Sequence, residues 1–171
     1  MAQTSTEFGQ LNSKAPADLA HFAFLIGRFQ CEAKVLLQSG KWQTFQAEWK
    51  GRYFLDGYAI EDEYRMTDSS GELIVLGMNY RIYDPARKTW NIKWLDALAG
   101  TWLDLGSPEF GGVRIDHPSI TYIFREPMAG HAFTRATYTK NPDGHFSWRG
   151  EKSADGKAWT LFMSLEAHRL S

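Results

Sequence analysis

The sequence of 171 residues holds a single cysteine, Cys31, so the chain cannot form an internal disulfide. A lone cysteine is typical of proteins that fold in a reducing compartment, and we expect a cytoplasmic protein. The first residues have neither a positively charged start nor an apolar core, so they do not resemble a signal peptide. No apolar run approaches the about 20 residues that a membrane-spanning helix needs. We therefore expect no membrane partner.

The chain also lacks an excess of positive charge. Its 19 lysines and arginines are balanced by 20 acidic residues, so a nucleic-acid partner is not expected. The motifs of phosphate-binding loops and nucleophile elbows are absent. Cys31 has no neighbouring group that would activate its thiol, and we expect it to pack as a small apolar side chain.

The histidines do not stand at metal-ligand spacing. The five are His21, His117, His131, His145 and His168. No pair has the HxH or HExxH pattern of a metal site. We therefore predict no metal site and no cofactor. A haem held by one histidine inside a barrel stays open at this point.

Aromatic side chains are abundant: seven Trp, seven Tyr and 11 Phe make up 15% of the chain. Many of them lie in short alternating runs separated by turn residues, which is typical of β-strands. We predict about nine or ten strands between residues 26 and 169, with turns at residues 55–57, 67–71 and 141–144. The one predicted helix is a short segment at residues 16–25, whose apolar residues would plug a barrel end.

Strands joined by short turns pair antiparallel with their neighbours, and a long sheet curls until it closes. The sequence therefore predicts an all-β fold: a single antiparallel up-and-down barrel of about 8–10 strands with a short helix before it. We assign residues 1–16 to a flexible arm and residues 17–171 to the barrel domain.

The stretch at residues 49–66 carries the most unusual pattern. After its turn, one side of the strand holds Ile60, Asp62, Tyr64 and Met66, and the other holds Glu61, Glu63 and Arg65. A carboxylate inside an apolar cavity would have a raised pKa and could act as a general acid or base. The alternative is that these charges face water and pair across strands. A one-residue change of register decides between the two.

Two stretches of the sequence, one short and one long, resemble known proteins. Residues 24–29, Phe-Leu-Ile-Gly-Arg-Phe, resemble the first-strand motif of calycins, the group of lipocalins and fatty-acid-binding proteins, in which the position of Phe29 is a tryptophan. The resemblance implies that Arg169 packs over that ring. A second resemblance, from about residue 25 to residue 169, is to an uncharacterised bacterial family of calycin-like domains. It is carried by Trp49-x-Gly51-Arg52-Tyr53, Glu61-Asp62-Glu63-Tyr64, Tyr83-Asp84-Pro85, Trp90-x-x-x-Trp94-x-Asp96 and Trp148-x-Gly150-Glu151. It implies a lipocalin-type barrel and no particular reaction.

We weigh three functions for such a barrel. The first is binding of a small apolar or aromatic molecule in the lumen. Its predicted ligand-binding residues are Tyr80, Trp90, Trp94, Met78 and Trp148. The second is a cofactor-free lyase, isomerase or cyclase in the same pocket. Its base would be Glu63 or Asp96, with Tyr64 or Arg135 stabilising negative charge. The third is a scaffold module with a filled barrel. A homodimer is a further partner that the sequence leaves open.

Overall fold

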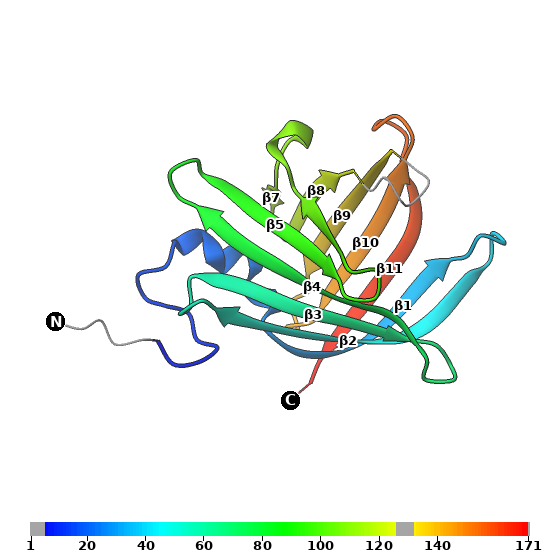
Figure 1. Ribbon diagram of the computed structural model, residues 1–171, viewed down its shortest axis with the longest axis horizontal. Coiled ribbons are helices and arrows are strands. Elements are labelled where there is room, and N and C mark those ends of the chain that lie inside the picture. Colours follow the sequence, from blue (N-terminus) through cyan, green and yellow to red (C-terminus); the bar gives the residue numbers. More distant parts are fainter. Residues whose placement is uncertain (1–5, 126–131, 171) are drawn as a thin grey trace.

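The computed structural model describes residues 6–125 and 132–170. One antiparallel sheet of eleven strands curls into a half-barrel (Figure 1). The elements in chain order are η1 (Ala17–Leu25), β1 (Gly27–Leu36), β2 (Trp42–Phe54), β3 (Ala59–Thr67), β4 (Leu73–Asp84), β5 (Thr89–Asp96), β6 (Thr101–Leu105), η2 (Pro108–Phe110), β7 (Arg114–Asp116), β8 (Ser119–Phe124), β9 (Phe133–Lys140), β10 (Phe146–Ser153) and β11 (Thr160–Arg169).

Strand order follows the chain on both sides of the β1–β11 pair. The sheet runs from β6 back to β1 and then from β11 back to β7. The first and last strands therefore pair, and the two sheet edges are β6 and β7, which are only five and three residues long. Within residues 6–125 and 132–170 no ladder joins β6 to β7. The predicted antiparallel, up-and-down order is confirmed, with eleven strands in place of about 8–10.

Local sequence explains how the strands form and turn. In β1 the buried side chains of Phe29, Cys31 and Ala33 alternate with exposed polar ones, which is the period of a strand with one wet face. The β2–β3 turn contains Leu55, Asp56 and Gly57 at φ of 50°, 55° and 80°. A Cβ on Gly57 would lie 2.3 Å from the backbone nitrogen of Asn12, so this turn position requires glycine.

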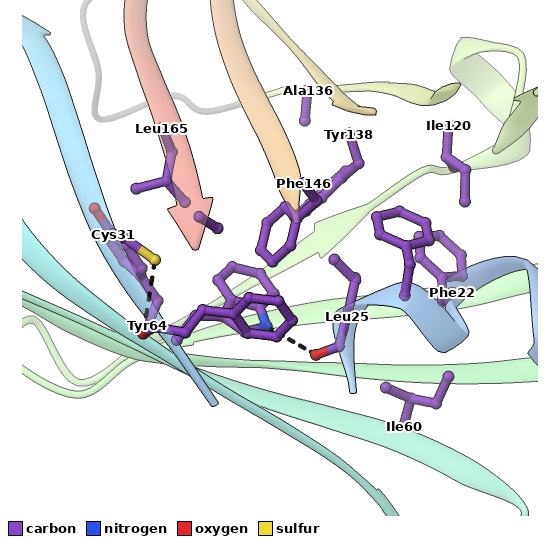
Figure 2. Close-up of a cluster of buried hydrophobic side chains, with 14 of the residues drawn as sticks. Phe22, Leu25, Cys31, Ile60, Tyr64, Ile120, Ala136, Tyr138, Phe146 and Leu165 are labelled. Atoms are coloured by element: carbon purple, nitrogen blue, oxygen red, sulfur yellow. Dashed lines mark hydrogen bonds between the residues drawn. The ribbon is translucent and has the colours of Figure 1, made fainter. Parts of the chain in front are cut away.

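The helical segment η1 covers one end of the half-barrel, as predicted for residues 16–25, and is a 3₁₀ helix. Its residues Leu19, Phe22 and Leu25 are fully buried, and Figure 2 shows Phe22 and Leu25 within the main apolar cluster. The Phe22 ring meets the Trp90 ring edge-on at 4.7 Å. The Trp49 indole donates a hydrogen bond to the Leu25 carbonyl at 3.2 Å, which fixes the end of η1 over the core.

Arg169 closes the same end from the last strand. Its guanidinium carbon lies 4.6 Å from the centroid of the Phe29 ring. The same group donates hydrogen bonds to the carbonyls of Ile26 at 2.8 Å and Phe24 at 3.3 Å. The arginine-over-ring contact that the calycin resemblance implies is therefore present, with a phenylalanine in place of the tryptophan.

The described residues before η1 lie along the β2–β3 turn. The Asn12 side chain donates to the Asp56 carbonyl at 3.1 Å, and the Asn12 backbone nitrogen donates to the Gly57 carbonyl at 3.3 Å. Arg52 of β2 lies over the Phe8 ring at 4.4 Å. The assignment of residues 1–16 to a separate arm stays a prediction. In the described ranges, no helix is both long and apolar enough to cross a bilayer.

Candidate functional site

A cavity of about 280 Å³ lies inside the curled sheet. Its walls are mainly rings and aliphatic groups from both halves of the sheet, with three polar residues among them. The lining residues are Trp49, Tyr64, Val75, Asn79, Trp94, Asp96, Leu103, Leu105, Tyr122, Phe124, Thr134, Ala136, Tyr138, Trp148, Phe162, Met163 and Leu165. An apolar pocket with a few polar groups is typical of a small-molecule site.

The cavity is deep at the η1 end and open at the other. The lining residues nearer η1, including Trp49, Asn79 and Tyr138, are buried. The lining residues at the far strand ends, such as Asp96 and Phe162, are only half-buried. A ligand would therefore enter from the end opposite η1 and meet Asn79 and Tyr138 last.

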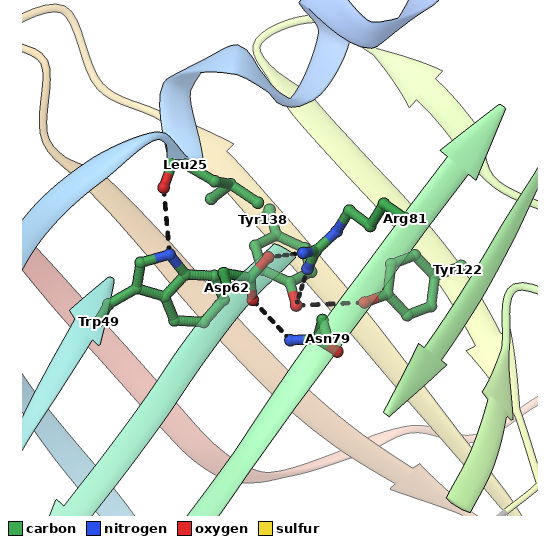
Figure 3. A network of polar contacts seen from close by, with 7 residues as sticks. All are labelled: Leu25, Trp49, Asp62, Asn79, Arg81, Tyr122 and Tyr138. Atoms are coloured by element: carbon green, nitrogen blue, oxygen red, sulfur yellow. Dashed lines mark hydrogen bonds and ion pairs between the residues drawn. The ribbon is translucent and has the colours of Figure 1, made fainter. Parts of the chain in front are cut away.

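A buried ion pair lies at this deep end (Figure 3). The Arg81 guanidinium binds the Asp62 carboxylate, and both side chains are fully buried. Asn79 donates to the second oxygen of Asp62 at 2.8 Å. The guanidinium also lies over the Phe22 ring at 5.1 Å. The opposite charges of Arg81 and Asp62 cancel, so the deep end has no net charge. Either charge buried without the other would be strongly unfavourable.

Two tyrosines extend this network to the cavity wall. Arg81 donates to the Tyr138 hydroxyl at 3.2 Å, and the Tyr122 hydroxyl donates to the same oxygen at 3.1 Å. Burial is the main reason that the pKa of Tyr122 is raised well above its ordinary value, and the neighbouring Tyr138 raises it further. Burial, with a smaller contribution from Cys31, also raises the pKa of the Tyr64 phenol. Both phenols are therefore neutral hydrogen-bond donors near neutral pH.

Some predicted site residues meet at this cavity. Tyr64, Trp94, Asp96 and Trp148 all line it. Trp94 pairs with Asn79 of β4, and its indole lies over Gly77, where a Cβ would come within 2.1 Å of the ring. Asp96 is at the open end, where one carboxylate oxygen accepts the backbone N–H groups of residues 98 and 99, each at 2.9 Å.

Trp90 lies outside the lining of the cavity. It is buried beneath η1, with Phe22 at 4.7 Å and Tyr83 at 5.3 Å between ring centroids. Its indole therefore supports the closed end, and a ligand in the described cavity would not contact it.

Met78 and Tyr80 point away from the cavity. The Tyr80 ring packs on the outer face against Phe54 at 5.3 Å and Trp102 at 6.0 Å. Their neighbours in β4, Asn79 and Arg81, face inward and are buried. The inward face of β4 is thus the more polar one, and Met78 and Tyr80 lie on its outward face.

Glu63 and Arg135 also lie on the outer face. The Glu63 carboxylate pairs with Lys50 at 3.5 Å on the surface. Arg135 donates to Glu151 at 2.9 Å and lies over the Trp159 ring at 4.5 Å, in a separate outer cleft. The geometry of Glu63 corresponds to the alternative in which strand charges face water and pair across strands, whereas Arg135 and Glu151 pair in a partly buried cleft. Neither Glu63 nor Arg135 enters the site that we propose.

The ion pair and its tyrosines are the features that sequence reasoning missed. Asp62 shares a strand side with apolar residues, and Tyr122 and Tyr138 alternate with apolar or small residues in β8 and β9. A charged residue at an otherwise apolar strand position was the available signal. Its partner Arg81 is on the next strand, but Tyr138 is 57 residues further on.

No group of histidine, cysteine and acidic side chains in the described chain is arranged to hold a metal ion. No histidine is among the lining residues of the cavity, so none of the described ones reaches a ligand there. His131 lies outside the described residues.

Comparisons with known proteins inform the fold. No family model matches the chain, and no curated protein matches it at the sequence level. The crystal structure of Rv2717c from M. tuberculosis is similar over 92% of this chain and 100% of that one, with a TM-score of 0.63 and 10% identity. At that identity the likeness shows a shared fold: a curled antiparallel β-sheet of barrel type.

Proposed function

We propose that the protein binds a small, mainly aromatic molecule in the cavity of the half-barrel. The observation that carries the proposal is the cavity itself: about 280 Å³ in volume, walled by indole and phenol rings, and open at one end. Rings such as Trp94 and Trp148 offer large contact areas with few rotatable bonds. Their arrangement favours a flat ligand that packs between them.

The size of the cavity speaks against a purely structural barrel. One water molecule needs only about 10–15 Å³ of such space, which is far less than the volume found. Protein interiors are close-packed, and large voids cost stability. A scaffold would gain from larger side chains at Ala136, which lies on the wall. The retained space therefore supports the binding function.

The alternative, a cofactor-free lyase, isomerase or cyclase, has less support. One of its two candidate bases, Glu63, is on the outer face, and the buried Asp62 is neutralised by Arg81. Asp96 is the remaining carboxylate on the cavity wall, and two backbone N–H groups already bind one of its oxygens. Because this arrangement explains Asp96 as a turn residue, we place binding ahead of catalysis.

A titration with N-phenyl-1-naphthylamine, a neutral aromatic dye that brightens in apolar sites, tests the proposal. We expect saturable binding with energy transfer from Trp49, Trp94 and Trp148, which line the cavity. The variant Ala136→Phe places a ring in the same space and should lower dye affinity at least about tenfold, since overpacking excludes the ligand.

The matched control is Asn91→Phe, which adds the same ring at an exposed position of β5. It should bind the dye as the wild type does. If Ala136→Phe binds equally well while it stays folded, the dye is elsewhere and the proposal is wrong. Native mass spectrometry of freshly purified protein would then look for a molecule that copurifies.

A further inference from the structure

We propose that the ligand carries a neutral hydrogen-bond acceptor, such as a ketone or other carbonyl oxygen, and that the Tyr122–Tyr138 hydroxyl pair binds this acceptor at the deep end. The inference rests on the proposed binding function and specifies its ligand class: a small aromatic carbonyl compound that enters acceptor first.

The two tyrosine hydroxyls carry one proton each. A phenol has one proton to donate and accepts through its oxygen. The Tyr138 oxygen accepts from both Arg81 at 3.2 Å and Tyr122 at 3.1 Å. The Tyr138 proton then has no acceptor among the residues that the structure describes. Tyr138 is 3% exposed and lines the cavity, so its proton is available to a ligand there.

The conclusion does not depend on the direction of the bond between the tyrosines. Arginine can only donate, so the Tyr138 oxygen keeps that bond in either case. If Tyr138 donated to Tyr122, the Tyr122 proton would be the free one, and Tyr122 also lines the cavity. The pair therefore always presents one donor, and a buried donor without a partner costs about 1–3 kcal/mol. A ligand acceptor would remove that cost.

A carboxylate would need a cation at the deep end, and Arg81 is the cation that contacts Tyr138. Its charge is already neutralised by Asp62. The lining of the cavity includes no lysine or arginine, and its one charged side chain, Asp96, is acidic. An anion would thus be buried without a partner, at a cost of several kcal/mol. The acceptor must be neutral.

The Tyr138 hydroxyl is a strong hydrogen-bond donor that is held in place before a ligand binds. The Tyr138 hydroxyl accepts a bond from a guanidinium, and a hydroxyl that accepts from a cation donates more strongly. Asp62 and Asn79 hold Arg81 in place, with the Asn79–Asp62 bond at 2.8 Å. The donor is therefore fixed before any ligand arrives, which lowers the entropic cost of binding.

Three naphthalene probes of one shape separate the possibilities: 2-acetylnaphthalene, 2-isopropenylnaphthalene, which has no acceptor, and 2-naphthoate, which is an anion. Displacement of N-phenyl-1-naphthylamine gives each affinity. In the double variant Tyr122→Phe/Tyr138→Phe, affinity for the ketone should fall about 3- to 10-fold, the equivalent of one neutral hydrogen bond. Affinity for the hydrocarbon should stay within about twofold, which also shows that the cavity is intact.

Tyr80→Phe is the matched control, because it removes one phenol hydroxyl from a ring that packs outside the cavity against Phe54 and Trp102. It should retain the affinity for the ketone. The inference is overturned if the double variant binds the ketone as tightly as the wild type does, if both probes weaken equally, or if 2-naphthoate binds the wild type more tightly than the ketone. If none of the probes nor the dye binds the wild type, the proposed function itself fails.

Discussion

The buried ion pair at the deep end should dominate the response to mutation. Asp62 and Arg81 are both fully buried, so Asp62→Asn leaves the guanidinium without a counter-charge. Removing one partner of a buried pair costs about 3–5 kcal/mol. For a chain of this length, 1 kcal/mol corresponds to roughly 2–4 °C in Tm. We therefore expect the Tm of Asp62→Asn to fall by roughly 6–20 °C.

Removing both charges of the pair should cost less stability than removing one. Replacing both partners by apolar residues of similar volume, Asp62→Leu with Arg81→Met, removes the uncompensated charge along with the attraction. The double variant should therefore be more stable than Asp62→Asn, although it changes two buried residues. Urea unfolding followed by tryptophan fluorescence gives the three free energies of unfolding on one scale.

An exposed pair provides the matched control. Lys93 and Asp104 form a salt bridge at 2.6 Å, but their side chains are 54% and 75% exposed. Exposed pairs contribute about 0–1 kcal/mol, so Asp104→Asn should leave the unfolding midpoint almost unchanged. An Asp62→Asn variant that loses less than about 1 kcal/mol would refute the argument, and so would a double variant that is less stable than this single one.

Two further predictions follow from buried groups. Burial first, with a smaller effect of Glu48, raises the pKa of the Cys31 thiol to about 12. In the unfolded chain the thiol ionises near its ordinary pKa of 9.0. Ionisation of Cys31 therefore leaves the free energy of unfolding unchanged below that pH and lowers it by about 1.4 kcal/mol per pH unit above it. Urea midpoints at pH 8, 9 and 10 measure the fall, and a Cys31→Ala variant with an equally steep fall between pH 9 and 10 would contradict the assignment. Gly77→Ala brings a Cβ within 2.1 Å of Trp94 and 2.6 Å of the Leu95 carbonyl, and should cost about 1–3 kcal/mol and weaken dye binding. Unchanged tryptophan emission and dye affinity in this variant would mean that the Trp94 wall is not as described.

The strands and turns were predictable because their signals are local. Turn residues such as those at 55–57 and 141–144 lie where the structure turns, and alternation within each strand is set by the pleat. Strand β3 ends at Thr67 and strand β4 begins at Leu73, on either side of the turn expected at residues 67–71. Up-and-down order then follows, because neighbours joined by short turns pair.

The site was less predictable, because its polar groups meet only through the curl of the sheet. The Arg81–Tyr138 bond joins β4 to β9, which lie far apart in the strand order. No local pattern specifies that contact. Trp94 and Trp148 could be chosen from their chemistry, since aromatic rings are common on pocket walls. Tyr80 has the same chemistry and lies outside, so ring content does not fix the face of a strand.

The face of β4 depends on one irregularity in its pairing with β3. The ladder shifts by one residue between Met66 and Thr67, where the pairing is irregular. Had the pairing of Thr67 with Leu73 continued without the shift, Asp62 would lie opposite Met78, and the apolar side of β4 would face the core. With the shift, Asp62 lies opposite Asn79, and polar side chains turn inward. This shift in register therefore places a buried ion pair where apolar side chains would otherwise lie, and it sets the polarity of the cavity's deep end.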